Sequence, residues 1–390
     1  MVGDERSGDK LSGKRQSVND KRVPELDGIR AIAIWMVLGD HLVNGLPNPP
    51  GALDRVPKIV LFVIGHGWLG VDLFFVLSGF LITGILLDSR TKPDYFKNFY
   101  ARRFLRIVPL YYTVLILMWL CYPGNSNYFL ISILFLANFY YGLHISQPHG
   151  PGVFWSLAVE EHFYMLWPWL VFYLPRRSLT LAALTIVAAV PVLRVVGLQH
   201  GLNVENEIYS YSWFRFDGLA LGALLAIWIR SPRANRTASL KLCLSMIAAA
   251  IVVTVGGIPW GILEAHSVLR YSQAQLIFGA FLLSSVSLGG SVFTSPLRWS
   301  FARLSSDLSY CVYLIHLAVG DAYMYFSKVA GFAPEATFGP VKGIIIRATI
   351  VLAMTFAIAL LSRRFLEQPI LKLKRYFEDT RQTTVVSTVT

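Results

Sequence analysis

Long apolar runs recur along the whole chain, and they constrain its fold more than any other feature. Each is close to the 17 to 25 residues that an α-helix needs to cross the hydrocarbon core of a bilayer. Because 55% of the residues are hydrophobic and only 15% are charged, a water-soluble fold would lack the polar surface to cover itself. We therefore expect an all-α, polytopic membrane protein with about ten transmembrane helices. The runs occupy residues 29–46, 60–87, 107–122, 154–174, 179–196, 214–229, 240–257, 273–290, 305–326 and 343–361.

The two ends of the chain are polar and lie outside these runs. Residues 1–23 are rich in Ser, Lys, Arg and Asp, so we expect a disordered, basic cytoplasmic tail and not a signal peptide. Residues 24–370 are expected to form one transmembrane domain, followed by a cytoplasmic C-terminal tail over 371–390. No segment recurs at a fixed period, so a repeat array is not expected.

The distribution of basic residues predicts the topology. If both termini are cytoplasmic and the ten runs alternate in direction, the outer loops retain only a few of the 35 Lys and Arg residues. This agrees with the positive-inside rule, so the net charge of +12 does not indicate a nucleic-acid partner. A further apolar segment, 128–141, is expected to be re-entrant or interfacial, since an eleventh crossing would move basic pairs to the outside. The outer basic residues are Arg55, Lys58, Arg270, Lys328 and Lys342.

Ionisable side chains inside apolar runs are costly, so each marks a candidate functional site, with helix packing as the alternative. Arg30 and His41 are eleven residues apart in the first run. This spacing puts them on one helix face, about 16 Å apart along the axis, with His41 in the outer third. A lone helix histidine is more often a packing residue than a catalytic one, so His41 by itself leaves both readings open.

Carboxylates occur in two other runs. By helix rise, Glu160 lies at about the depth of His41, next to Glu161. A carboxylate and an imidazole at one level of a bundle are the parts of a general-base pair, in which the acid orients the imidazole. Asp72, in the second run, also needs a polar or charged partner inside the membrane. The sequence does not show whether either carboxylate contacts His41.

Two further groups of charged residues have two readings each. Arg102, Arg103 and Arg106 either anchor the chain by the positive-inside rule or bind the phosphates of an anionic ligand. Arg215 and Asp217, at the start of the sixth run, are equally compatible with an intrahelical ion pair and with binding of an acceptor. The three cysteines and the histidines show no metal-ligand spacing, so no metal is expected.

Taken together and in order, motifs along the chain resemble those of the acyltransferase-3 family of membrane acyltransferases. The resemblance runs from about residue 24 to 370. Members of that family transfer acyl groups, usually acetyl, to hydroxyls of sugars in envelope glycans, exported polysaccharides and some metabolites. The motifs are Arg30 with His41, 72–80, Arg102-Arg-x-x-Arg106-Ile-x-Pro109, 155–164, Arg215-x-Asp217, Ser309-Tyr310-x-x-Tyr313-Leu-x-His316 and Glu367-x-Pro369.

The resemblance implies a role for each matching residue. His41 would be the essential catalytic histidine, with Glu160 and Asp72 as further catalytic residues that shape and orient its surroundings. The donor would be acetyl-CoA or another acyl-CoA, held by Arg30, Arg102, Arg103, Arg106 and Ser78. The residues expected to bind the acceptor are Trp155, Glu161, Tyr164, Arg215 and Asp217. Two-domain members of the family are not expected to be models for this chain, because we see no fused esterase-like domain.

These roles combine into a mechanistic hypothesis. The coenzyme's phosphates stay at the cytoplasmic mouth, its thioester reaches His41, and His41 acts as general base on a hydroxyl that arrives from the outer side. A covalent acyl-histidine is the alternative. We expect a bacterial inner-membrane location and a carbohydrate or glycoconjugate acceptor, whose identity the sequence leaves open, as it does the oligomeric state.

Two other classes of protein compete with this hypothesis. A transporter or flippase would use the buried polar residues as a pathway, and predicts inverted repeats and broken helices that we do not see. A non-catalytic membrane subunit would need neither the arginine cluster nor the level of His41 and Glu160.

Overall fold

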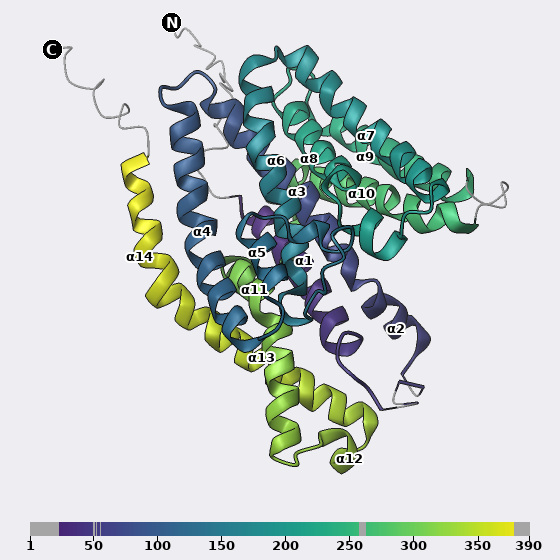
Figure 1. Cartoon of the computed structure of the whole chain (residues 1–390). Helices are drawn as coiled ribbons and strands as arrows, with labels where there is room; N and C mark the ends of the chain where they lie inside the picture. Colours follow the sequence, from purple (N-terminus) through teal and green to yellow (C-terminus); the bar gives the residue numbers. More distant parts are fainter. Residues whose placement is uncertain (1–22, 50, 52, 55, 257–262, 378–390) are drawn as a thin grey trace, which may run out of the picture.

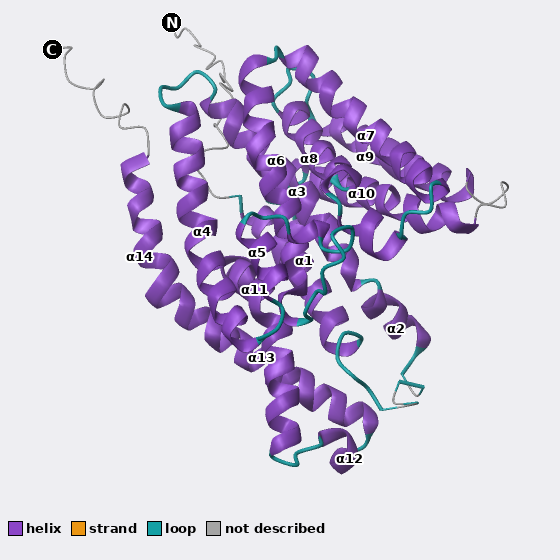
Figure 2. Ribbon diagram, viewed as in Figure 1, coloured by secondary structure: helices purple, strands orange, loops and turns teal. Residues whose placement is uncertain are grey.

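A computed structural model describes residues 23–377, apart from 50, 52, 55 and 257–262 (Figure 1). Within these ranges the chain consists of helices and loops, and no strand is present, as predicted (Figure 2). The predicted tails lie outside the described residues over 1–22 and 378–390. The described beginning of the C-terminal tail continues in helical form to residue 377.

Most of the described residues belong to α-helices, which short 3₁₀ and π segments connect. The α-helices are α1 (Pro24–Val43), α2 (Lys58–Gly65), α3 (Gly70–Ser89), α4 (Tyr95–Cys121), α5 (Ser126–Ile133), α6 (Phe154–Tyr173), α7 (Arg176–Gln199), α8 (Phe216–Ile229), α9 (Arg236–Gly256), α10 (Leu263–Ser287), α11 (Ser300–Val329), α12 (Pro334–Phe338), α13 (Pro340–Ser362) and α14 (Gln368–Leu371). The short segments are η1 (Gly67–Leu69), η2 (Ala137–Phe139), η3 (Gly150–Val153), η4 (Val204–Ile208), η5 (Ser212–Phe214), η6 (Val292–Arg298), η7 (Arg363–Glu367) and η8 (Lys372–Phe377).

Each predicted apolar run is largely helical, although the run 60–87 is divided among α2, η1 and α3, and fewer helices meet a strict requirement for a membrane span. Among the described residues, five helical stretches are long and apolar enough to cross a bilayer, or six if the bent pair Ser267–Ser287 and Val292–Arg298 counts as one. α8 is shorter, at 14 residues. The chain is thus an integral membrane protein with several spans, while ten crossings and cytoplasmic termini stay predictions. The five stretches are Lys58–Ser89, Tyr95–Cys121, Arg176–Gln199, Arg236–Val255 and Pro340–Phe377.

The helices divide into a central set and a peripheral set. In the apolar window of Lys58–Ser89, 72% of the residues are buried, whereas in α7 and α9 the buried share is only 22%. Figure 1 shows α7 to α10 grouped on one side of the bundle and α4 and α14 on the other, with α1, α3, α6 and α11 between them. Because the peripheral helices expose leucine, isoleucine and valine side chains, their outer faces are suited to lipid.

Close helix contacts fix the position of α3. Gly79 of α3 lies against the backbone of Leu219 in α8, and Gly222 of α8 lies against the backbone of Val76 in α3. Glycine is required at both positions, because a Cβ would come within 2.0 Å of a carbonyl oxygen. Small residues at a helix interface allow this close approach of two backbones.

The segment 128–141 is not a continuous helix. α5 contributes only eight residues, about 12 Å of rise, which is less than half the thickness of the hydrocarbon core. The chain then turns at Phe135, whose φ is 56°, and continues in η2. Tyr128 and Asn138 are buried against the bundle, as expected for a segment that does not cross the membrane on its own.

Candidate functional site

A cavity of about 280 Å³ lies between the central helices and collects many of the predicted site residues. α3 lines it with residues at helical spacing, from Val71 through Phe74 and Ser78 to Ile85. The spacing of three to four residues puts these side chains on one face of α3. The opposite face of the helix carries Gly79 and packs on α8, so the contact that holds α3 in place also turns this stripe towards the cavity.

Three arginines line one end of the cavity. Arg30 of α1 donates to Ser306 Oγ of α11 at 3.0 Å and lies 3.5 Å from Asp27 Oδ1. Arg103 and Arg106 come from neighbouring turns of α4. Neither Arg103 nor Arg106 forms an ion pair with any residue that the structure describes. This end of the cavity therefore carries positive charge that the protein does not neutralise by direct pairing.

Hydroxyl and carboxyl groups line the middle of the cavity. Tyr164 OH donates to Glu160 Oε2 at 2.9 Å, one helical turn away on α6, and also contacts Ser78 Oγ of α3. The guanidinium of Arg103 lies 4.7 Å from the centre of the Tyr164 ring, within range of a cation–π interaction. The predicted residues Ser78, Glu160 and Tyr164 are thus brought together in one polar group, next to the arginines.

A hydrogen bond between two helices lies at the end of the cavity away from the arginines. Tyr313 of α11 and Ser156 of α6 both line the cavity, and their hydroxyl oxygens are 2.5 Å apart. The ring of Tyr313 also lies 5.9 Å from the ring of His316. His316 therefore lies next to a residue that lines the cavity.

His41 pairs with a second histidine and not with a carboxylate. Its Nδ1 lies 2.7 Å from Nε2 of His316 on α11, and the angle between the planes of the two rings is only 10°. The pair forms because α1 and α11 run side by side in the same direction, with Arg30 opposite Ser306 at one end and His41 opposite His316 at the other. His41 and Arg30 thus contact α11 about three turns apart, as their spacing on one helix face predicts.

A polar group on the loop before α6 lies next to the histidine pair. His149 donates from Nδ1 to Asp321 Oδ1 at 2.6 Å, and Tyr122 OH donates to Asp321 Oδ2 at 2.6 Å. The hydrogen bond to Asp321 raises the pKa of His149 above its usual value of 6.5, because the carboxylate favours the charged imidazolium.

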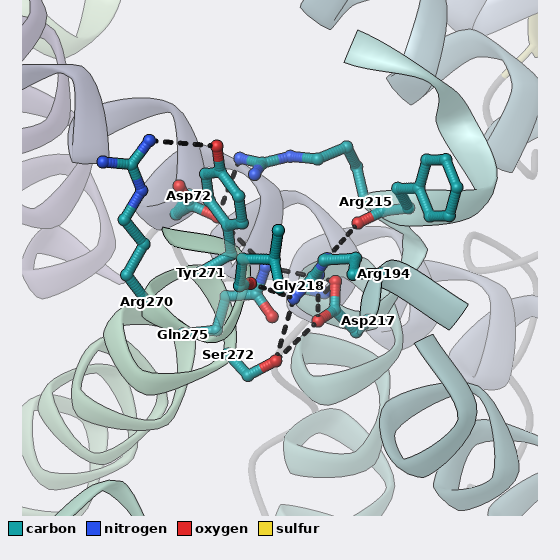
Figure 3. A network of polar contacts seen from close by, with 11 residues as sticks. Asp72, Arg194, Arg215, Asp217, Gly218, Arg270, Tyr271, Ser272 and Gln275 are labelled. Carbon is teal, nitrogen blue, oxygen red and sulfur yellow. Dashed lines mark hydrogen bonds and ion pairs between the residues drawn. The ribbon is translucent and has the colours of Figure 1, made fainter. Parts of the chain in front are cut away.

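The two carboxylates predicted to orient His41 have other partners. Glu160 bonds to Tyr164, as described above, and Asp72 takes part in a buried network (Figure 3). In that network Asp72 Oδ1 lies 2.9 Å from Arg215, and Gln275 donates to Asp72 at 3.0 Å and to Asp217 at 3.2 Å. Among the described residues, therefore, neither Asp72 nor Glu160 forms the hydrogen bond to His41 that the predicted orienting role requires.

Arg215 and Asp217 do not pair with each other, although they are two residues apart. Arg215 pairs with Asp72 of α3, and Asp217 pairs with Arg194 of α7, which also donates to Ser272 of α10 at 2.9 Å (Figure 3). All four ionic side chains are at most 2% exposed. The network thus joins α3, α7, α8 and α10, and binding of an acceptor to Arg215 or Asp217 would require it to open.

Three further predicted residues lie outside the cavity lining. Arg102 donates from Nε to the carbonyl of Asn98 on its own helix, at 3.0 Å. The ring of Trp155 packs 4.5 Å from that of Tyr209, beside the buried network. Glu161 has a buried Oε1 without a hydrogen-bond partner among the described residues. Their predicted roles in binding donor or acceptor stay predictions.

Some residues of the site were only weak signals in the sequence. The hydroxyls of Ser309, Tyr310 and Tyr313 recur at helical spacing and were compatible with a cavity or with bonds across helices, and the structure shows both. Arg194 and Gln275 were not selected, although an ionisable or amide side chain in an apolar run marks a candidate. No group of three potential metal ligands occurs in the part of the chain that the structure describes.

Comparisons with known proteins agree with the motif pattern. A family model described as an acyltransferase domain matches residues 23–364. The chain is similar to the peptidoglycan O-acetyltransferase OatA of Listeria monocytogenes, with 28% identity over 388 residues that cover 90% of this chain and 56% of that protein. It is also similar to the O-acetyltransferase OatA of Staphylococcus aureus, with 26% identity over 384 residues that cover 90% of this chain and 57% of that protein.

A third relative is an uncharacterized protein of Haemophilus influenzae, 32% identical over 182 residues that cover 40% of this chain and 74% of that protein. The chain spans a little over half the length of the two OatA proteins that it matches. No solved structure matches it significantly.

Proposed function

The chain belongs to the acyltransferase family whose domain model matches residues 23–364, and from this membership we propose that it is a membrane O-acyltransferase. The reaction moves an acyl group, acetyl by default, from an acyl-CoA to a hydroxyl of a carbohydrate in the cell envelope or in an exported glycan. A carbohydrate acceptor is supported by the relatives named as peptidoglycan O-acetyltransferases.

The observation that carries the proposal is the charge at one end of the cavity. Other buried arginines are neutralised by direct ion pairs, such as Arg194 with Asp217 and Arg347 with Glu335. Arg103 and Arg106 have no such partner in the described chain, and both line the cavity beside Arg30. Arginine is well suited to bind phosphate oxygens, so an unpaired group of this kind fits an anionic donor such as acyl-CoA.

The size of the cavity sets how a coenzyme would occupy it. At about 280 Å³ the cavity is slightly smaller than the roughly 300–1,000 Å³ of typical ligand pockets. It suits a thin acyl-bearing arm, while the phosphates and nucleotide stay outside at the arginines. This order places the arginine end on the cytoplasmic side, where acyl-CoA is made, and directs the acyl group towards Tyr313 and the histidine pair.

The chemistry proposed at the far end is general-base catalysis. His41 takes the proton of the acceptor hydroxyl as its oxygen attacks the thioester carbonyl, and returns that proton to the sulfur of the leaving coenzyme A. Tyr313 must move, or its hydrogen bond to Ser156 must open, for the thioester to reach His41. The alternative route through an acyl-histidine is decided by quenching labelled enzyme in the absence of acceptor, because only that route leaves label on the protein.

The donor site is tested by calorimetry of acetyl-CoA binding to purified protein in detergent. Arg103→Gln and Arg106→Gln should each weaken binding by roughly 10- to 150-fold, since a hydrogen bond to a charged group contributes about 1.5–3 kcal/mol. Arg102→Gln is the matched control, because it makes the same change of charge on the same helix at a side chain that does not line the cavity. Equal effects at all three positions would indicate that these arginines anchor the chain at the membrane and do not bind the donor specifically.

Catalysis is tested with radiolabelled acetyl-CoA and soluble fragments of envelope glycan. His41→Ala should abolish transfer while leaving the affinity for acetyl-CoA unchanged, because His41 lies beyond the cavity and away from the arginines. Transfer at the wild-type rate by this variant would contradict the proposed mechanism. Transfer by neither protein to any glycan, with tight binding of acetyl-CoA retained, would contradict only the acceptor class.

A further inference from the structure

His316 makes two kinds of hydrogen bond that together determine the protonation of its partner. Its Nδ1 lies 2.8 Å from the carbonyl oxygen of Tyr313 and 3.2 Å from that of Val312, one turn back on α11. A carbonyl oxygen only accepts hydrogen bonds, so Nδ1 of His316 must carry a hydrogen. In the neutral imidazole the other nitrogen, Nε2, then has no hydrogen and can only accept.

The same donor and acceptor argument then applies to His41. Its Nδ1 lies 2.7 Å from Nε2 of His316, and because Nε2 of a neutral His316 can only accept, Nδ1 of His41 must donate. His41 is then left with a lone pair on Nε2, which is the nitrogen free to take a proton. His316 is 1% exposed, so water does not offer its Nε2 an alternative partner.

We propose that His316 is the positioning residue that holds His41 in the tautomer with a basic Nε2 and shares the charge that His41 acquires. This proposal rests on the acyltransferase function proposed above, and assigns to His316 the orienting role that the sequence had suggested for Glu160 or Asp72. Both of those carboxylates are bonded elsewhere.

The proton balance of the step is complete within the pair and its substrates. The acceptor hydroxyl gives its proton to Nε2 of His41, which makes the pair carry one positive charge. The proton between Nδ1 of His41 and Nε2 of His316 can then lie on either nitrogen, so the charge is spread over two rings. When the C–S bond of the tetrahedral intermediate breaks, Nε2 of His41 returns its proton to the thiolate, and both histidines are neutral again.

In this arrangement His316 has the role of the aspartate in a Ser-His-Asp triad, which holds the catalytic histidine in one tautomer and stabilises its charged form. An imidazole in place of a carboxylate carries no negative charge, so the resting pair is neutral. A neutral pair avoids the cost of an unpaired buried charge at this depth of the bundle.

The kinetic test compares two substitutions at the same position. His316→Leu removes the acceptor for Nδ1 of His41, and should lower kcat by roughly 10²- to 10⁴-fold without changing KM for acetyl-CoA. His316→Gln places an amide oxygen where it can accept from Nδ1, and should recover a large part of kcat. His162→Leu is the control, since it removes a histidine of α6 that bonds Ser212 and does not touch His41. Equal losses for the leucine and glutamine variants, or a wild-type kcat in both, would overturn the positioning role.

A second measurement does not depend on activity. NMR of protein labelled with ¹⁵N-histidine, assigned with His41→Gln, reports which ring nitrogen of His41 carries the hydrogen. We expect it on Nδ1 in the wild type and in His316→Gln, and on Nε2 in His316→Leu. A wild-type His41 protonated on Nε2 would overturn the proposal. If the wild type shows the expected tautomer but no acyl transfer, the proposed function fails while the assignment of His316 stands.

Discussion

The substitution Gly79→Ala tests whether the contact between α3 and α8 holds the cavity in shape. A Cβ at Gly79 would lie 1.9 Å from the carbonyl oxygen of Leu219, so the two helices would have to move apart by about 1.5 Å to reach the 3.4 Å of ordinary contact. Overpacking typically costs about 1–3 kcal/mol, and we take the upper end, about 3 kcal/mol, because the obstacle is backbone. It outweighs the gain of roughly 1 kcal/mol from replacing a helical glycine by alanine. We expect a net destabilisation of about 2 kcal/mol.

The assay is thermal unfolding in detergent, followed with a thiol-reactive dye that reports exposure of the buried Cys243 and Cys311. A loss of about 2 kcal/mol should lower Tm by roughly 2–3 °C in a chain of 390 residues. Gly222→Ala, whose Cβ would lie 2.0 Å from the carbonyl oxygen of Val76, should act in the same direction. Gly39→Ala is the matched control, because it lies in α1 with nothing within 4 Å, and should raise Tm slightly. A rise in Tm for Gly79→Ala as well would refute the close packing of α3 on α8.

Three more predictions concern other parts of the site. Asp217→Ala leaves Arg194 buried without its ion pair, and should destabilise the protein by about 3–5 kcal/mol in the same unfolding assay; a shift within error would contradict a structural role. The raised pKa of His149 implies stability that is fully present below its ordinary value of 6.5 and is lost as the pH rises through the folded value. Asp321→Asn should remove this dependence of Tm on pH. If Tm of the variant still depended on pH in the same way, a group other than the His149–Asp321 pair would be responsible. Tyr313→Phe removes the hydroxyl that bonds Ser156 across the cavity, and should increase hydrolysis of acetyl-CoA without acceptor; unchanged hydrolysis would show that another group excludes water.

Much of the cavity lining was predictable from the sequence, through the family resemblance and through helix geometry. The resemblance selected Arg30, Arg103, Arg106 and Ser78 for the donor and Tyr164 for the acceptor, and Glu160 was selected as an ionisable residue inside an apolar run. All six line one cavity. Their joint placement follows from depth, which the rise of 1.5 Å per residue determines once the first residue of a helix is known.

The partners of the charged residues were less predictable, because a helix also has a direction in which each side chain points. Arg102 and Arg106 share a helix face by spacing, yet the cavity is lined by Arg103 and Arg106. Arg215 and Asp217 suggested a pair within one helix, and each instead found its partner on a different helix. His41 was matched to carboxylates at its depth, and the structure places His316 against it.

The sequence by itself therefore determined the class of the protein, which segments are helical and how far apart polar groups lie along one helix, because these depend on composition, period and rise along one chain. Only the tertiary structure decided which of several groups at one depth face one another. That choice depends on how each helix is rotated about its axis and which helix it packs against. Here close glycine contacts between α3 and α8, and the parallel course of α1 and α11, set both.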